Sequence, residues 1–374
     1  MVQTTKIRKA FFVVAVALLM GSFSNPTSRQ NSRTSASGIV KRILYQVWTP
    51  KRCDRCQFYD VEFSDIYLKD GPKLKSRRIV EGGQSPSWSP DGKRIAYVGF
   101  GSGGMAMCRQ LYVANPDGSG IKQITNLHAG MDEFSWSPVE EKIAYSEDRP
   151  SGGGQTAIMI VNEDGSGLKE VVVASTRCAP GFEYPLEWSP DGQKIAFTGC
   201  ADGKPVIVVM GENGENAGTV VKGSNARWSP DGKRLLFIHD SESTPAVPGI
   251  WISNADGTEP ERILDGESAS FGLSWFPDGK GIAFGSKSEN KKQSEIFRIN
   301  TDGTGLAKIA STKGWSLSTP IFSPDGTKLV VDAETPFDGD GRDSQFSVLL
   351  IDMSGHGQER LAKGNYAGII WGNR

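Results

Sequence analysis

The chain has 374 residues, with 42 Lys and Arg against 43 Asp and Glu, and a formal net charge of −1. Because the opposite charges are mixed throughout, there is no basic surface for nucleic acid, and we expect no nucleic-acid partner. The composition, 37% hydrophobic and 23% charged, is that of an ordinary globular protein. Length alone suggests two domains, but a repeat within the sequence favours one.

The first 24 residues differ in kind from the rest. Lys6, Arg8 and Lys9 precede an apolar run at 10–20, and small residues follow it, which is the pattern of a secretory signal peptide. That run is too short to anchor a mature chain across a bilayer, although an uncleaved N-terminal anchor is the alternative. Residues 25–37 are polar and rich in Ser and Thr, which predicts a disordered linker. The sequence therefore predicts a periplasmic or secreted monomer without a membrane span in the mature chain.

One unit recurs along the remaining sequence. Residues 87–97, SWSPDGKRIAY, join an aromatic anchor at Trp88 to a turn and a second apolar run. Related units contain Trp136, Trp188, Trp228, Trp275 and Phe322. Successive anchors are 48, 52, 40, 47 and 47 residues apart. A period in the forties is typical of a propeller or a solenoid.

Each unit predicts two β-hairpins, and hence a four-stranded antiparallel sheet. In the S-P-D-G turn, Pro presets φ, Asp tolerates the third turn position and Gly accepts a positive φ. In the turn after Trp136, Val139 and Glu140 replace Asp and Gly, which predicts a non-glycine residue forced toward positive φ. A second turn, N-x-D-G, follows at residues 115–118, 162–165, 254–257 and 300–303. The anchor Trp is large enough to fill the space between neighbouring sheets, where its N–H needs an acceptor.

The motif W-S-P-D-G-K-x-I-A-[FY], followed by [IL]-Y-V-x-N-x-D-G-S-G, resembles the repeat of TolB-type β-propellers, whose blades are similar to those of WD-repeat proteins. The resemblance covers residues 38–374 and implies an all-β propeller that binds other proteins of the bacterial envelope. TolB also has an α/β domain before its propeller, and only the linker occupies that place here. We therefore expect a TolB-like propeller that is not TolB itself, so the Tol–Pal role does not carry over.

The first blade lacks its innermost strand in the N-terminal sequence. Residues 39–48 align with the strand that normally follows the S-P-D-G turn, whereas 366–371, ending in Trp371, look like the missing inner strand. A C-terminal strand added to an N-terminal sheet closes the ring without a free edge. We predict seven blades, with six as the alternative if this composite sheet is a stray pair.

Alternating turns give the ring two different faces. The S-P-D-G and N-x-D-G turns lie together on what we call the uniform face, and the longer insertions lie on the opposite, variable face. All cysteines fall on the variable face: Cys53, Cys56, Cys108, Cys178 and Cys200. In an exported protein this favours disulfides, and Cys178 with Cys200, which flank one hairpin, is the favoured pair. Cys53 and Cys56 form a disulfide with each other, or one of them pairs with Cys108; a redox or metal-binding role is the alternative. Because the number of cysteines is odd, one thiol is left unpaired.

Signals for catalysis are weak. His128, His239 and His356 are scattered, and there is no G-x-S-x-G, H-E-x-x-H or phosphate-binding loop. TolB-type propellers also resemble the gating domain of prolyl-oligopeptidase-like enzymes, which need a further hydrolase domain, and pectic lyases, which use a histidine-rich metal site. We expect no catalytic residue, metal or cofactor.

Two sets of residues are candidates for binding. Asp132, Glu133, Glu183, Glu187 and Arg227 lie on or just before the predicted inner strands, where they form either a site for a cation or basic segment or a solvated rim. Aromatic side chains at Phe58, Tyr59 and Phe100 lie in or beside the loops of the variable face, as interface residues often do.

From these observations we expect a non-enzymatic scaffold for an unidentified envelope or extracellular protein. The alternative is an enzyme or ligand-binding protein acting on saccharide or peptide at the channel mouth.

Overall fold

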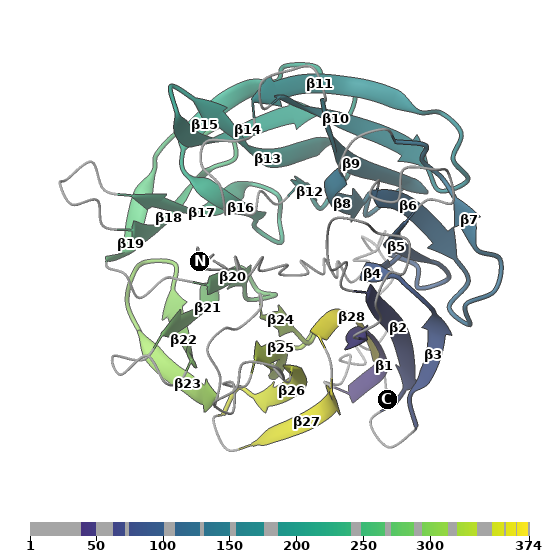
Figure 1. Cartoon of the computed structure of the whole chain (residues 1–374). Helices are drawn as coiled ribbons and strands as arrows, with labels where there is room; N and C mark the ends of the chain where they lie inside the picture. Colours follow the sequence, from purple (N-terminus) through teal and green to yellow (C-terminus); the bar gives the residue numbers. More distant parts are fainter. Residues whose placement is uncertain are drawn as a thin grey trace, which may run out of the picture.

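The chain is a ring of antiparallel sheets (Figure 1). The computed structural model describes residues 39–49, 63–71, 75–100, 109–127, 131–149, 155–175, 186–240, 248–265, 271–287, 294–312, 320–334, 346–354, 357–363 and 365–372. The predicted signal peptide and linker lie outside these ranges, as does most of the variable face. Regular structure in the described ranges is entirely β, and they contain no helix long and apolar enough to cross a membrane.

Seven four-stranded antiparallel sheets form the blades, which confirms the predicted architecture. In each blade the strands are named from the innermost to the outermost. Blade 1 contains β28 (Asn365–Gly372), β1 (Ile39–Thr49), β2 (Phe63–Asp70) and β3 (Arg77–Val80). Blade 2 contains β4 (Gln84–Trp88), β5 (Ile95–Phe100), β6 (Arg109–Ala114) and β7 (Lys122–Gln123). Blade 3 contains β8 (Met131–Trp136), β9 (Lys142–Asp148), β10 (Gln155–Asn162) and β11 (Lys169–Ser175).

The remaining blades repeat this order. Blade 4 contains β12 (Leu186–Trp188), β13 (Lys194–Ala201), β14 (Lys204–Gly211) and β15 (Gly218–Lys222). Blade 5 contains β16 (Ser224–Trp228), β17 (Arg234–Asp240), β18 (Pro248–Asn254) and β19 (Glu261–Asp265). Blade 6 contains β20 (Phe271–Trp275), β21 (Gly281–Lys287), β22 (Ser294–Asn300) and β23 (Ala307–Thr312). Blade 7 contains β24 (Ile321–Phe322), β25 (Lys328–Glu334), β26 (Phe346–Asp352) and β27 (Gln358–Lys363).

The two ends of the described chain meet in blade 1. β28 pairs antiparallel with β1, from Ile39 opposite Gly372 to Gln46 opposite Asn365. Lys69 Nζ in β2 also donates to the Leu361 carbonyl in blade 7 at 2.6 Å. The predicted closure of the ring by the C-terminal strand is therefore confirmed.

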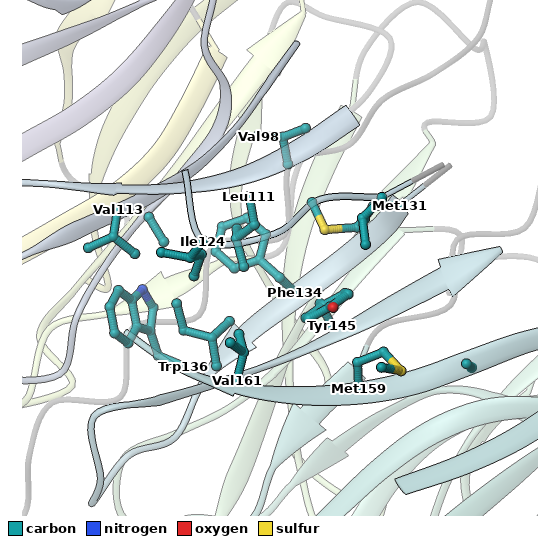
Figure 2. Packing of buried hydrophobic residues seen from close by; sticks show 14 residues of the cluster. Val98, Leu111, Val113, Ile124, Met131, Phe134, Trp136, Tyr145, Met159 and Val161 are labelled. Atoms are coloured by element: carbon teal, nitrogen blue, oxygen red, sulfur yellow. The ribbon is translucent and has the colours of Figure 1, made fainter. Parts of the chain in front are cut away.

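Apolar side chains pack mainly between neighbouring blades. Figure 2 shows the cluster between blades 2 and 3, where Val113 from β6 and Trp136 from β8 lie among other buried side chains. Blades 2 and 3 are covered on both faces, and β5 and β10 are accordingly apolar along most of their length. This packing holds the inner strands around the axis of the ring.

Three of the five anchor tryptophans between Trp88 and Trp275 bind the preceding blade, as the sequence predicts, whereas Nε1 of Trp88 and of Trp136 is buried without a hydrogen-bond partner among the described residues. The indole Nε1 groups of Trp188, Trp228 and Trp275 donate to the carbonyls of Ser135, Glu187 and Arg227. Each of these distances is 3.2 Å. The acceptor is in each case the residue before the preceding anchor, so the contact fixes one inner strand against the next.

The S-P-D-G turns form a repeated hydrogen-bond network. In blade 2, Ser89 Oγ donates to Asp91 Oδ1 at 2.8 Å, and the same Oγ accepts from the Arg94 backbone N–H at 2.9 Å. The prediction that the altered turn of blade 3 forces a non-glycine residue toward positive φ is wrong. Glu140 is not in that region, because the turn opens into a bend in which its N–H donates to Ser137 Oγ at 3.3 Å.

The N-x-D-G turns lie on the same face as the S-P-D-G turns. The Glu163 N–H in the second turn of blade 3 donates to the Glu141 carbonyl beside the first turn at 2.8 Å. Equivalent bonds are present in blades 4, 5, 6 and 7, donated by Glu212, Ala255, Thr301 and Met353. These bonds support the predicted uniform face.

Candidate functional site

Many residues singled out in the sequence fall outside the described residues. These are the candidate binding residues Phe58, Tyr59 and Glu183, the candidate disulfide cysteines Cys53, Cys56 and Cys178, and the side chains of Asp132 and of the ring-closing Trp371. Phe100 is half-buried at the end of β5, and Glu133 is half-buried in β8, where its N–H donates to Ser146 Oγ at 3.0 Å. Their role in binding stays a prediction.

Cys200 lies near the end of β13 and is disulfide-bonded. The other four cysteines lie outside the described part of the chain. The pairing of Cys200 with Cys178 therefore stays a prediction.

Two charged residues of the predicted constellation meet in the wall of the ring. Glu187 is the middle residue of β12, and Arg227 precedes the anchor Trp of β16 in the next blade. Glu187 Oε2 lies 3.7 Å from Arg227 Nη1, and the two side chains are only 6% and 7% exposed. The structure thus places this part of the constellation inside the protein, whereas the sequence suggested the mouth of the channel.

Burial changes the chemistry of Glu187. Loss of solvent raises its pKa to about 7, and the opposing effects of Arg227 and of the Trp228 backbone N–H do not restore the ordinary value. Oε2 has no hydrogen-bond partner among the described residues, and 3.7 Å is longer than a hydrogen bond. Burial therefore favours the protonated, neutral form of Glu187 more than in an exposed glutamate.

The pair is unusual among the inner strands of the described blades. The residue before the anchor is Ser87, Ser135, Ser274 or Ile321 in the other blades whose side chains are described. Sequence reasoning found both charged residues but missed their contact. The sequence did contain a signal for this contact: Glu187 and Arg227 both directly precede the anchor Trp, in two successive repeats. The indole bonds show that residues at this position lie next to each other around the axis of the ring.

The uniform face has a shallow hollow between blades 5 and 6. It has a volume of about 290 Å³ and is lined by Pro230, Asp231, Arg234, Pro277, Asp278 and Gly279. Arg234 Nη2 donates to the Gly279 carbonyl at 2.8 Å, and its guanidinium lies over the Trp275 ring. This arginine therefore joins two blades.

Groups suited to catalysis are dispersed in the described chain. His239 makes an edge contact with Trp251 in blade 5, with ring centroids 5.6 Å apart, whereas His128 and His356 lie outside the described residues. Within the described ranges, no three His, Cys, Asp or Glu residues are close enough together to hold a metal ion.

Comparison with known proteins agrees with the architecture. The family model described as the TolB beta propeller domain matches residues 184–368, which include β12 to β27 and part of β28. The chain is a TolB-like β-propeller.

Relatives of this TolB-like propeller differ in how much of their length it spans. An uncharacterised protein of Agrobacterium fabrum is 29% identical over 291 residues, which are 74% of this chain and 75% of that protein. The Tol-Pal system protein TolB of Bordetella pertussis is 30% identical over 151 residues, which are 38% of this chain but only 30% of TolB. The match to TolB therefore covers a minority of either protein.

A solved structure shows the same fold. The β-propeller domain of the trilobed protease from Pyrococcus furiosus has a TM-score of 0.60 and 16% sequence identity to the TolB-like propeller. The alignment covers 86% of this chain and 94% of that domain. At this identity the similarity concerns the fold alone.

Proposed function

We propose that this protein is an exported, non-enzymatic scaffold that binds a protein of the bacterial envelope or exterior. One observation supports this proposal: the polar groups that recur from repeat to repeat form hydrogen bonds within the ring and so hold it together. Three of the anchor indoles and the turn serines and aspartates bind within the ring, so distinctive recognition is left to the loops. Loops on a rigid scaffold commonly carry function.

Similarity to TolB supports an envelope location. The matched relative from Bordetella pertussis is a protein of the Tol-Pal system, and the N-terminal sequence has the pattern of a signal peptide. We place the mature protein in the periplasm or outside the cell, where a disulfide at Cys200 would persist.

We propose the variable face as the binding surface. The sequence predicts that Phe58, Tyr59 and Phe100 lie in or beside its loops, and aromatic side chains provide much of the energy of protein interfaces. The uniform face repeats nearly the same polar turn in most blades, which gives a partner little to distinguish.

Partner capture with charged variants tests both parts of the proposal. The exported protein and its Phe58→Glu and Phe100→Glu variants would be cross-linked in cells, and captured proteins compared by quantitative mass spectrometry. Ile121→Glu is the matched control, because Ile121 is an apolar residue, 51% exposed, beside a turn of the uniform face. We expect a specific partner to be lost from both Phe variants, with unchanged melting, and retained by Ile121→Glu.

Two results would contradict the proposal. Capture that survives both Phe substitutions while melting falls would assign those rings to packing of their own loops. Turnover of a saccharide or peptide by the purified protein would instead support the enzymatic alternative.

A further inference from the structure

Glu187 holds the anchor of the next blade at two points. Its backbone carbonyl accepts from Trp228 Nε1 at 3.2 Å, and its carboxyl accepts from the Trp228 backbone N–H. Trp228 is itself only 4% exposed. The contact between blades 4 and 5, which we call the 4–5 seam, therefore depends on one titratable side chain at its innermost edge.

Ionisation of Glu187 is costly in this position. A buried carboxylate oxygen without a hydrogen bond loses its hydration without replacement, and Oε2 has no such bond among the described residues. Arg227 opposes this cost at 3.7 Å, but the direction of the shift shows that burial dominates. Any motion that separated β12 from β16 would rehydrate the carboxyl and favour its ionised form.

Other charged groups lie on the strands that pack against β12. On β9, Lys142 is at the start and Glu147 and Asp148 are at the end; Lys194 begins β13. On β8, Glu133 and Asp132 are near the start, the side chain of Asp132 lying outside the described part. The charged group that acts on Glu187 is Arg227.

We propose that the 4–5 seam is proton-dependent: protonated Glu187 keeps β12 and β16 together, and loss of this proton favours opening of the seam. A group with a raised pKa in the folded state contributes stability that is fully present below its unfolded pKa, near 4.3 for Glu. That contribution is lost as pH rises to about 7, the folded-state value.

Hydrogen exchange at the Trp228 backbone amide tests the proposal, because this N–H contacts the Glu187 carboxyl. Protection factors, corrected for the intrinsic pH dependence of exchange, would be measured from pH 5 to 8. We expect protection to fall by nearly tenfold per pH unit between about pH 5 and 7 and then to level off. In Glu187→Gln the protection should not depend on pH.

Glu163→Gln is the matched control. Glu163 also has a raised pKa, caused first by desolvation and then by Glu141, but it lies on the uniform face. This variant should keep the parent's pH dependence at Trp228. Since Glu187→Gln could fail to fold, the carboxyl carbon of Glu187 would also be titrated by NMR in the unaltered protein. A midpoint below pH 5, a flat protection profile, or an unchanged slope in Glu187→Gln would overturn the proposal.

Discussion

Two glycines with nearly the same backbone conformation lie between the third and fourth strands of their blades but have different surroundings. Gly71 in blade 1 and Gly118 in blade 2 have φ of 82° and 85°. A Cβ on Gly118 would lie 2.1 Å from the Ile79 carbonyl oxygen in the preceding blade, whereas a Cβ on Gly71 would meet no atom of the described residues within 4 Å. Of these two glycines, only Gly118 lies in a turn that closely approaches the neighbouring blade.

This pair separates backbone strain from steric overlap. Gly71→Ala should lower the free energy of unfolding by about 1–2 kcal/mol, the cost of a left-handed residue with a Cβ. Gly118→Ala should cost about 1–3 kcal/mol more, because the turn must move away from blade 1. Urea unfolding of both variants is the measurement. Equal losses would mean that the turn is not packed against Ile79.

At the scale of the element, β28 determines whether blade 1 has an unpaired edge. Deleting residues 365–374 should make the protein prone to aggregation, because β1 would then present free backbone groups. The sequence predicts that Trp371 is the aromatic anchor of this strand, and on that prediction Trp371→Ala should cost about 3–5 kcal/mol. Thermal unfolding and light scattering provide the readouts, with deletion of residues 373–374 as the control. A shortened chain that melted with the parent would contradict a stabilising role for β28.

Elements that depend on local sequence could be predicted well. The S-P-D-G and N-x-D-G turns determine the hairpins through their own residues. The N-terminal sequence lacks the inner strand of blade 1, and a matching strand could be recognised in the C-terminal sequence. The Glu187–Arg227 contact could not be predicted in this way, because it depends on how two inner strands in different blades are aligned. Glu140 shows a different limit, since the altered turn relaxed into a bend instead of keeping the repeat's conformation.

For the whole molecule, the repeated turns predict sensitivity to acid. Hydrogen bonds from Ser or Thr to the aspartates of the N-x-D-G turns hold the pKa of each carboxyl below its usual value; the affected residues are Asp117, Asp164, Asp256 and Asp302. Since the folded state favours their ionised forms, their contribution is present above the unfolded pKa near 3.9 and is lost as pH falls through the lower folded values.

Calorimetry between pH 5 and 2.5 should therefore show a falling melting temperature below about pH 4. Replacing the four aspartates with Asn should make this fall shallower, while a melting temperature that stayed constant down to pH 2.5 would contradict the assigned role of the turns. The stability contributed by these aspartates therefore increases with pH, whereas the stability contributed by Glu187 decreases as pH rises toward 7. The ring should thus be most stable in mildly acidic solution.

The pairing of β28 with β1 has a consequence for how the gene could be rearranged. Ile39 and Gly372 face each other across one sheet, so a short peptide joining them would turn the propeller into a covalent circle. New ends could then be opened in the turn of another blade, such as the Asp202–Gly203 turn, where a Cβ on Gly203 would meet no atom of the described residues within 4 Å. Such circular permutants would keep every strand pair while moving the termini to a different sector, and a fused protein could be directed to any chosen blade.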